Sequence, residues 1–428
     1  MSQPARSAWL GAVAVAASIA ACAAWLTRMP LDYTCRWGVD AEGAAQFRAL
    51  LHVPFGAATT STFRAGFAMA LALVWITYVV LVARGLAGAV PPRAHVAKLT
   101  AALAVALAVA APPALSVDVY AYVGYARLAV VHHLNPYVET QAKLVALGDP
   151  TGPFLRWPIS SPYGAAWTLY SMLVVALLPK ASIVAPFIAL RLTSAVAVLA
   201  LAEGGRRLAR RLVPGREELV FAALALNPLF LLEGVASGHN DVVMMALVVW
   251  ALALAVEGRF ATSLLLVGLA SSIKFVPIVL APWLVLAAWQ AAPVARRASA
   301  AALGAGLAAV PVAATSLVFW RGAGTLAGVR ARAGQGLHPA GGFVASAAVA
   351  LVVCAGLTVW VARDPLTRAP RAWIPASLTL LVLFSGMWFP WYFVWPWALA
   401  LVVLDGASLA WTGVVWGAVL LSQLSYLR

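Results

Sequence analysis

Residues 97–128 read AKLTAALAVALAVAAPPALSVDVYAYVGYARL, in which a long apolar run ends shortly before an aspartate, Asp118. An apolar run of about 18 residues or more is long enough to cross roughly 30 Å of hydrocarbon as a helix. Such runs follow one another along the 428 residues, of which 64% are hydrophobic. Because backbone groups in lipid must be paired within their own segment, the pattern predicts an all-α, polytopic membrane protein.

The formal net charge is +15, and the basic residues are expected in short loops between the apolar runs. An excess of lysine and arginine marks loops on the cytoplasmic side, where they also face anionic lipid headgroups. The charge therefore needs no nucleic acid to explain it. The residues concerned are Arg84, Arg93, Lys98, Arg206, Arg207, Arg210, Arg211, Arg216, Arg296, Arg297, Arg363, Arg368 and Arg371.

These basic loops give the predicted orientation, with the N-terminus in the cytoplasm. We expect a single integral membrane domain over residues 1–428, with outer-face loops at 116–182 and 321–340. The run 165–178 is interpreted as an interfacial or re-entrant helix, because a crossing there would bring the arginines at 206–211 to the outside. About 13 transmembrane helices are expected, at about 8–27, 63–88, 98–115, 183–202, 218–235, 241–257, 260–273, 275–290, 299–319, 341–362, 373–390, 391–404 and 408–427.

Asp118 is one of only 14 acidic residues, and the predicted orientation places it on the outer face. An acid beside a span is costly if it enters the hydrocarbon, so it either caps a helix or performs chemistry there. Both interpretations fit the residue alone. The stretch that follows, VYAYVGYARL, has the aromatic and amphipathic pattern of a helix that lies along the membrane interface.

Five short motifs follow one another from Asp118 onward. They stand as DVYAYVGYARL (118–128), NPY (135–137), RWPISSPYGAAW (156–167), SGHNDVVMMAL (237–247) and FPWYFVWPW (389–397). With these motifs in this order, the chain resembles the GT-C superfamily of glycosyltransferases. The closest resemblance is to the polyprenyl-phosphate-mannose-dependent α-mannosyltransferases of actinobacterial lipoglycan synthesis. One departure is Ala165, where the family usually has a proline after SPYG.

The resemblance implies an activity. Members of the family take a sugar from a polyprenyl-phosphate carrier and pass it, with inversion, to a glycan or glycolipid hydroxyl on the outer face of the bacterial plasma membrane. Asp118 matches the aspartate of the family's first motif and is implied as the general base. Neither a cofactor nor a divalent metal is expected. Mannose as the sugar rests on the resemblance alone.

The other candidate site residues would bind substrate. Cations and hydrogen-bond donors stabilise a phosphate leaving group, and aromatic rings can stack on a sugar. With the resemblance, these candidates are Tyr122, Arg127, Asn135, Tyr137, Tyr163, His239, Asn240, Asp241, Lys274, Arg332, His338, Trp391 and Tyr392.

Most of these candidates also have a purely structural interpretation. Asn240 or Asp241 could cap the next helix, and Lys274 could extend its amine to the headgroups. NPY is a good turn sequence, and the aromatic run at 387–397 could form an interfacial belt. Arg332 and His338 could lie in a solvated loop. Glu233 is expected to be a hydrogen-bonded structural group near the outer end of its span, with a second acid of the site as the alternative.

Two other functional classes remain open from the sequence. A transporter or flippase of a lipid-linked saccharide would need a polar path through the spans, which show almost no charge in their interiors. A polysaccharide polymerase or ligase would be expected to carry its long basic outer loop late in the chain, whereas the long loop here comes early.

Overall fold

The computed structural model is all-helical in the part of the chain that it describes, which is residues 3–30, 58–112, 115–152, 157–179, 182–328, 340–384, 389–404, 406–423 and 426. This confirms the expected all-α fold. The α-helices are α1 (Gln3–Leu26), α4 (Thr60–Leu86), α5 (Arg93–Ala110), α6 (Asp118–Val130), α7 (Lys143–Ala146), α8 (Ala165–Leu177), α9 (Val184–Leu212), α10 (Glu217–Ala225), α11 (Asp241–Val256), α12 (Phe260–Ile273), α13 (Leu280–Ala291), α14 (Arg297–Phe319), α16 (Ala340–Val361), α17 (Pro365–Phe384), α18 (Val394–Val402) and α19 (Gly406–Gln423). Short 3-10 turns occur at η3 (Val276–Val279), η4 (Val294–Arg296), η5 (Gly324–Leu326) and η6 (Pro390–Phe393), and η2 (Phe230–Ala236) is a π-helix.

Among the described residues, five helices are long and apolar enough to cross a membrane by themselves, namely α1, α4, α5, α9 and α14 with η4. The pair α10 and η2 could form a sixth crossing and is bent by 49° at its break. Several further apolar helices are shorter, from 10 to 17 residues. These lengths support a multi-pass membrane protein, and the count of about 13 spans stays a prediction.

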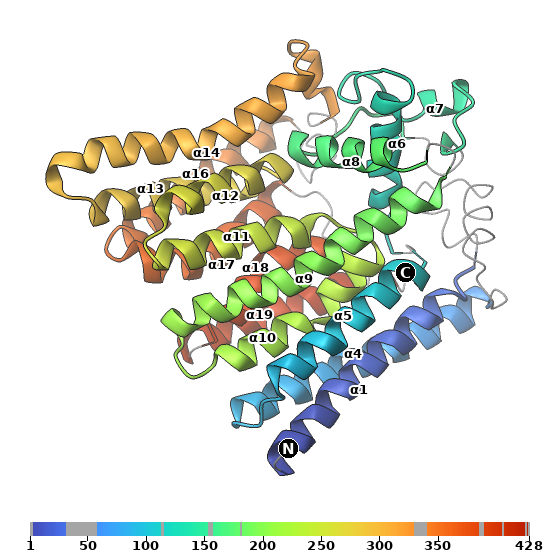
Figure 1. Ribbon diagram of the computed structural model, residues 1–428, viewed down its shortest axis with the longest axis horizontal. Coiled ribbons are helices and arrows are strands. Elements are labelled where there is room, and N and C mark those ends of the chain that lie inside the picture. The colour runs from blue at the N-terminus through green and yellow to red at the C-terminus, as the bar shows by residue number, and fades with distance from the viewer. Residues whose placement is uncertain are drawn as a thin grey trace.

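The long helices form one bundle with α9 near its centre, packed against α5, α10 and α11 (Figure 1). Helices α1, α4 and α5 lie side by side along one flank, and α12, α13 and α14 form another group. Aliphatic and aromatic side chains from most of the helices form one large buried cluster, and polar side chains such as Arg191 and Asn227 are buried as well. The loops and short helices from α6 to α8 gather at one end of the bundle, beyond the ends of α5 and α9.

Basic residues of three connections share the opposite end of the bundle. Arg93 lies 3.8 Å from Glu203, and Arg207 lies 3.8 Å from Glu257, so the connections α4–α5, α9–α10 and α11–α12 meet there. The expectation that these basic residues lie in loops is wrong for several of them. Arg206 and Arg207 lie within α9, and Arg368 and Arg371 lie within α17. Hydropathy marks only the apolar part of a helix, whereas the helix itself continues into the polar flank and can start at a proline such as Pro365.

The helix α6 lacks the exposed polar face of the expected amphipathic helix, and its place at the membrane interface stays a prediction. Every residue from Asp118 to Leu128 is buried, so α6 presents no exposed polar face. It packs against α8 and α9 and is covered by the chain that follows it: the hydroxyl of Tyr125 donates to the carbonyl of Ile159 at 2.8 Å, and Gln141 donates to the carbonyl of Ala121 at 2.7 Å. The apparent amphipathic pattern therefore reflects aromatic residues that pack inside the protein.

A helix break positions the segment after η2. Asn227 and Pro228 separate α10 from η2, and the Asn227 side chain accepts from the backbone of Leu229 at 3.0 Å and donates to Tyr78 at 2.9 Å. Proline cannot continue the backbone hydrogen-bond ladder, so the chain bends there. The π-helix then delivers residues 237–240 to the same end of the bundle as α6.

Candidate active site

Asp118 begins α6 and lies at the centre of a buried polar cluster. Its Oδ1 accepts from the hydroxyl of Tyr163 at 3.1 Å, and its Oδ2 lies 3.2 Å from Nδ1 of His239 and 3.5 Å from the hydroxyl of Tyr122. The side chain is 8% exposed. The carboxylate therefore binds side chains of two loops that are far from it in sequence.

Tyr163 reaches Asp118 because the SPYG segment packs tightly on the end of α12. The backbone amide of Gly164 donates to the carbonyl of Ile273 at 3.1 Å. A Cβ at Gly164 would lie 2.2 Å from the carbonyl oxygen of Ser272 and 2.5 Å from that of Ile273. Only glycine allows this approach, so the motif's glycine fixes the position of the tyrosine before it.

His239 comes from the turn before α11, where Gly238 has a φ of +77°. A Cβ at Gly238 would lie 3.1 Å from side-chain atoms of both Arg191 and Val119, so the turn is packed directly onto α9 and α6. The imidazole stacks on the ring of Trp391 with centroids 4.1 Å apart. Trp391 belongs to η6, which brings the late aromatic motif to the same place as Asp118.

A second acid, Asp241, lies at the start of α11 and is completely buried. Its Oδ1 accepts from Nζ of Lys274 at 2.6 Å and from Nε1 of Trp395 at 2.6 Å. Lys274 sits at the break between α12 and η3, with its amine 4.9 Å from the ring centre of Tyr392. The lysine, which the sequence allows to extend into the headgroups, instead points at a carboxylate.

Tyr122 joins the two acids. Its hydroxyl lies 3.5 Å from the backbone amide of Asn240, and its ring contacts that of Tyr163 edge-on with centroids 4.7 Å apart. Burial, together with the nearby charges of Asp118 and Asp241, raises the pKa of the Tyr122 hydroxyl well above its usual value. The phenol therefore stays protonated and can donate to Asp118.

The capping interpretation of the SGHND segment holds for position only, with Asn240 at the N-cap and Asp241 in the first turn of α11. Asn240 precedes α11, but its side chain makes no capping hydrogen bond. Within the described part of the chain, several buried polar atoms of this cluster have no hydrogen-bond partner. Such atoms are costly unless a ligand or water satisfies them. They are Oδ1 and Nδ2 of Asn240, Nε2 of His239, Oδ2 of Asp241 and Nε1 of Trp391.

Arg127 does not join this cluster. It lies nine residues further along α6, about 13 Å along the helix axis, and its Nε contacts Asp149 at 2.9 Å. His132 lies 2.7 Å from the same carboxylate. Burial raises the pKa of Asp149, but hydrogen bonds from Arg127, Thr151 and His132 outweigh it and lower the pKa to about 2. Asp149 is therefore ionised at neutral pH and ties the loop to α6.

The NPY motif forms a turn and connects the end of α14 to the SPYG segment by hydrogen bonds. Asn135 accepts from the backbone of Tyr137 at 2.9 Å and donates to the carbonyl of Phe319 at the end of α14. The hydroxyl of Tyr137 donates to the carbonyl of Tyr163 at 2.8 Å. The motif thus supports the SPYG segment from outside the acid cluster. Arg332 and His338 lie outside the described residues.

Several residues near the cluster are absent from the candidates that the sequence suggested. Arg191 is fully buried in α9, where it donates to the carbonyls of Val235 at 3.2 Å and of Ala111 at 2.6 Å. Glu233 is fully buried in η2. Charged residues inside apolar runs are rare, so each was a usable signal. The hydrogen bond from Tyr426 to Glu233 fits the expected structural role of that acid. The sequence pattern did not distinguish Trp395, which contacts Asp241, from the other aromatic residues of the motif at 389–397.

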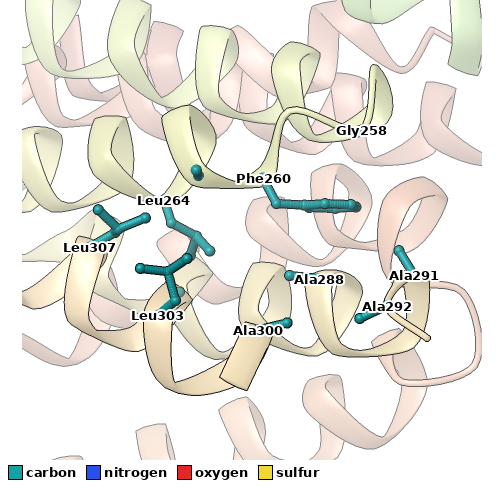
Figure 2. Close-up of a pocket in the computed structure, with 11 residues that line it drawn as sticks. Gly258, Phe260, Leu264, Ala288, Ala291, Ala292, Ala300, Leu303 and Leu307 are labelled. Atoms are coloured by element: carbon teal, nitrogen blue, oxygen red, sulfur yellow. The ribbon is translucent and has the colours of Figure 1, made fainter. Parts of the chain in front are cut away.

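Among the described residues, no three histidine, cysteine, aspartate or glutamate side chains are grouped as metal ligands would be. Two apolar cavities lie apart from the acid cluster. One of about 340 Å³ lies between α12, α13 and α14, where Phe260, Leu264 and Leu303 line it (Figure 2). The other, of about 540 Å³, lies between α4 and α19. Neither is lined by a residue of the cluster.

The fold and the site together define a class: helical proteins with several apolar helices able to span a membrane and a buried carboxylate site at one end of the bundle. The model of a family described as "Alpha-(1->6)-mannopyranosyltransferase, N-terminal domain" matches residues 8–291, and the chain belongs to this family. The matched range contains Asp118, Tyr163, His239, Asp241 and Lys274.

A relative from Mycobacterium tuberculosis (strain ATCC 25618 / H37Rv), Alpha-(1->6)-mannopyranosyltransferase A, is 26% identical over 324 residues, which are 67% of this chain and 61% of the relative. The chain thus spans about three fifths of the length of the curated relative it matches. No solved structure matches the chain significantly.

Proposed function

We propose that this protein is an inverting mannosyltransferase that forms α-(1→6) linkages. It takes mannose from a polyprenyl-phosphate carrier and transfers it to a hydroxyl of a glycan or glycolipid. The observation that carries the proposal is the carboxylate of Asp118, held by Tyr163 and His239 beside unpartnered buried polar atoms, in a chain that belongs to this family.

Asp118 acts as the general base in this proposal. The acceptor oxygen attacks C1 of the mannose, its proton passes to the carboxylate, and the bond from C1 to the phosphate oxygen breaks as the polyprenyl phosphate leaves. Tyr163 and His239 orient the carboxylate so that one face of it can meet the acceptor. Because the product is an α-mannoside and the reaction inverts C1, the donor must carry β-linked mannose.

The neighbouring residues are suited to the sugar and the phosphate. Lys274 is the cation closest to the cluster's second acid, and its side chain is 15% exposed, so it can also meet a phosphate oxygen. Asn240, His239 and Trp391 offer the unpartnered polar atoms. Sugar hydroxyls can satisfy these atoms, and Trp391 and Tyr392 can contact the sugar ring.

The same proposal sets the protein in the plasma membrane of a bacterium. The protein crosses this membrane about 13 times, with its N-terminus in the cytoplasm and Asp118 on the outer face. Support comes from the arginine-rich helix ends, which share the end of the bundle opposite to α6. The positive-inside rule assigns that end to the cytoplasm. The helix α8 is not counted as a span, because a crossing there would bring the arginines at 206–211 to the outer face.

The test uses the purified 428-residue protein in lipid nanodiscs, with a mannan oligosaccharide acceptor and radiolabelled mannose donors. Three donors are compared: β-linked polyprenyl-phosphate mannose, its α-linked anomer, and a nucleotide-linked mannose. We expect an α-(1→6)-linked product from the β-linked lipid donor alone. Product from the nucleotide donor alone, or a β-linked product, would refute the proposal. In a parallel assay with proteoliposomes, saccharide movement across the bilayer without transfer would favour a transporter.

A further inference from the structure

Glu233 is a buried acid with one unsatisfied oxygen. It lies in η2 with no exposed surface, and its Oε1 accepts from the hydroxyl of Tyr426 at 2.9 Å. Its Oε2 has no hydrogen-bond partner within the described residues and lies 3.9 Å from Nε2 of His239. The imidazole Nε2 is likewise buried and unpartnered there.

His239 therefore stands between two carboxyl groups. Its Nδ1 lies 3.2 Å from Asp118, and its Nε2 faces Glu233 on the opposite side of the ring. The backbone amide of His239 donates to the carbonyl of Glu233 at 3.3 Å, and Trp391 stacks on the ring. These contacts restrict rotation of the imidazole and keep Nε2 facing Glu233. A hydrogen bond between them requires the 3.9 Å separation to shorten by about 1 Å.

The nitrogen that carries the proton in a neutral imidazole is set by the hydrogen bond that the other nitrogen makes. A fully buried carboxyl beside another acid is costly to ionise, so Glu233 enters the site as a neutral acid with one O–H to donate. If that O–H points at Nε2, the ring proton must reside on Nδ1. Nδ1–H then donates to Asp118.

We propose that Glu233 is a positioning residue that fixes the tautomer of His239, so that Nδ1–H holds the Asp118 carboxylate in its basic form. This inference rests on the proposed function, in which Asp118 is the general base. Glu233 itself touches neither substrate in this account. Among the described residues, the ionisable side chains around the Asp118–His239–Glu233 line include Tyr122 of α6, Tyr163 before α8, Asp241 of α11, Cys22 of α1 and Tyr426 beyond α19.

Two variants separate this role from a packing role. Glu233→Gln keeps the size of the side chain, and its amide N–H can donate to Nε2 as the acid does. Glu233→Leu fills a similar volume with no donor. We expect Glu233→Gln to retain transfer within about threefold and Glu233→Leu to lose tenfold or more, because a wrong tautomer misaligns the base. Tyr426→Phe is the control, since it removes a contact of Glu233 but leaves the carboxyl in place.

The decisive measurement is the tautomer of His239 by NMR spectroscopy, which does not depend on turnover. The chain has six histidines, so ¹⁵N-histidine labelling in nanodiscs gives a small set of signals, and His239→Gln assigns the one of interest. At pH 7 we expect the Nδ1–H tautomer in wild type and Glu233→Gln, and a mixture or the Nε2–H tautomer in Glu233→Leu.

Three results would overturn the inference: an Nε2–H tautomer in wild type, an unchanged tautomer in Glu233→Leu, or equal loss of transfer in Glu233→Gln and Glu233→Leu. The first of these results is measured on the wild-type protein and does not depend on whether any variant folds. If wild type transfers no sugar from any donor, the proposed function fails, while the tautomer measurement still decides the role of Glu233.

Discussion

The contact between Asp241 and Lys274 is a buried ion pair. Asp241 is fully buried and Lys274 is 15% exposed. Removing one partner of a buried pair leaves an uncompensated charge and typically costs about 3–5 kcal/mol, whereas removing both costs less. We therefore expect Lys274→Met and Asp241→Asn each to lower thermal stability in detergent, and the double variant to lose less than their sum.

The control for this comparison of single and double variants is a more exposed lysine–carboxylate pair. Lys143 and Glu139 lie 2.9 Å apart with side chains 40% and 31% exposed. Surface pairs contribute less than about 1 kcal/mol, so Lys143→Met should change stability little. Strict additivity of Lys274→Met and Asp241→Asn would mean that the two residues do not stabilise each other.

The sequence alone identified most residues of this cluster but not their pairing. Asp118, His239, Asp241 and Lys274 stand out because charged and polar residues are rare next to apolar runs. That Lys274 meets Asp241 depends on how α11 and α12 pack, which no local pattern encodes. Arg127 shows the converse, since its charge suggested a phosphate ligand and the fold pairs it with Asp149.

Between elements, the most demanding contact is the one between the SPYG segment and the end of α12. Gly164→Ala would place a methyl group 2.2 Å from the carbonyl oxygen of Ser272, which is backbone and cannot turn aside. We expect a loss of about 1–3 kcal/mol in stability. Transfer should fall by more than tenfold, because Tyr163 would move away from Asp118.

The matched control is Gly306→Ala in α14. A Cβ there meets no atom within 4 Å, and alanine favours a helix over glycine by up to about 1 kcal/mol. This variant should keep full stability and transfer. Equal behaviour of Gly164→Ala and Gly306→Ala in thermal denaturation and in transfer would contradict the described packing.

The positions of several apolar helices were predictable because hydropathy reports on them directly. Predicted segments such as 260–273 and 241–257 coincide with α12 and α11 to within a residue. The burial of α6 was not predictable, because a helix covered by its own loop has the same aromatic pattern as one at the lipid surface. The bend between α10 and η2 arises at Asn227 and Pro228, where the sequence suggested one continuous span.

For the molecule as a whole, the proposed orientation assigns each end of the bundle to one side of the membrane. Glu139 lies in the loop after α6, and Glu257 follows α11 at the arginine-rich end. After replacement of the three native cysteines by alanine, we expect Glu139→Cys to react with an impermeant maleimide in intact cells. Glu257→Cys should react only after permeabilisation.

The two glutamates are a matched pair, since both are partly exposed and both contact a basic residue. Labelling of Glu257→Cys in intact cells, with Glu139→Cys unlabelled, would mean that the orientation is the reverse of the proposed one. The donor's sugar and Asp118 would then lie on opposite sides of the bilayer, or the donor would have to be cytoplasmic.

The central claim is that the Asp118 carboxylate accepts the acceptor's proton, and single-turnover transfer by Asp118→Asn tests it most directly. Asparagine keeps the size and the hydrogen bond from Tyr163 but cannot act as a base, so the rate should fall by about 10²–10⁴-fold. The exposed-acid control Glu139→Gln should transfer at the wild-type rate. An Asp118→Asn protein with wild-type thermal stability and a transfer rate within about threefold of wild type would contradict the account.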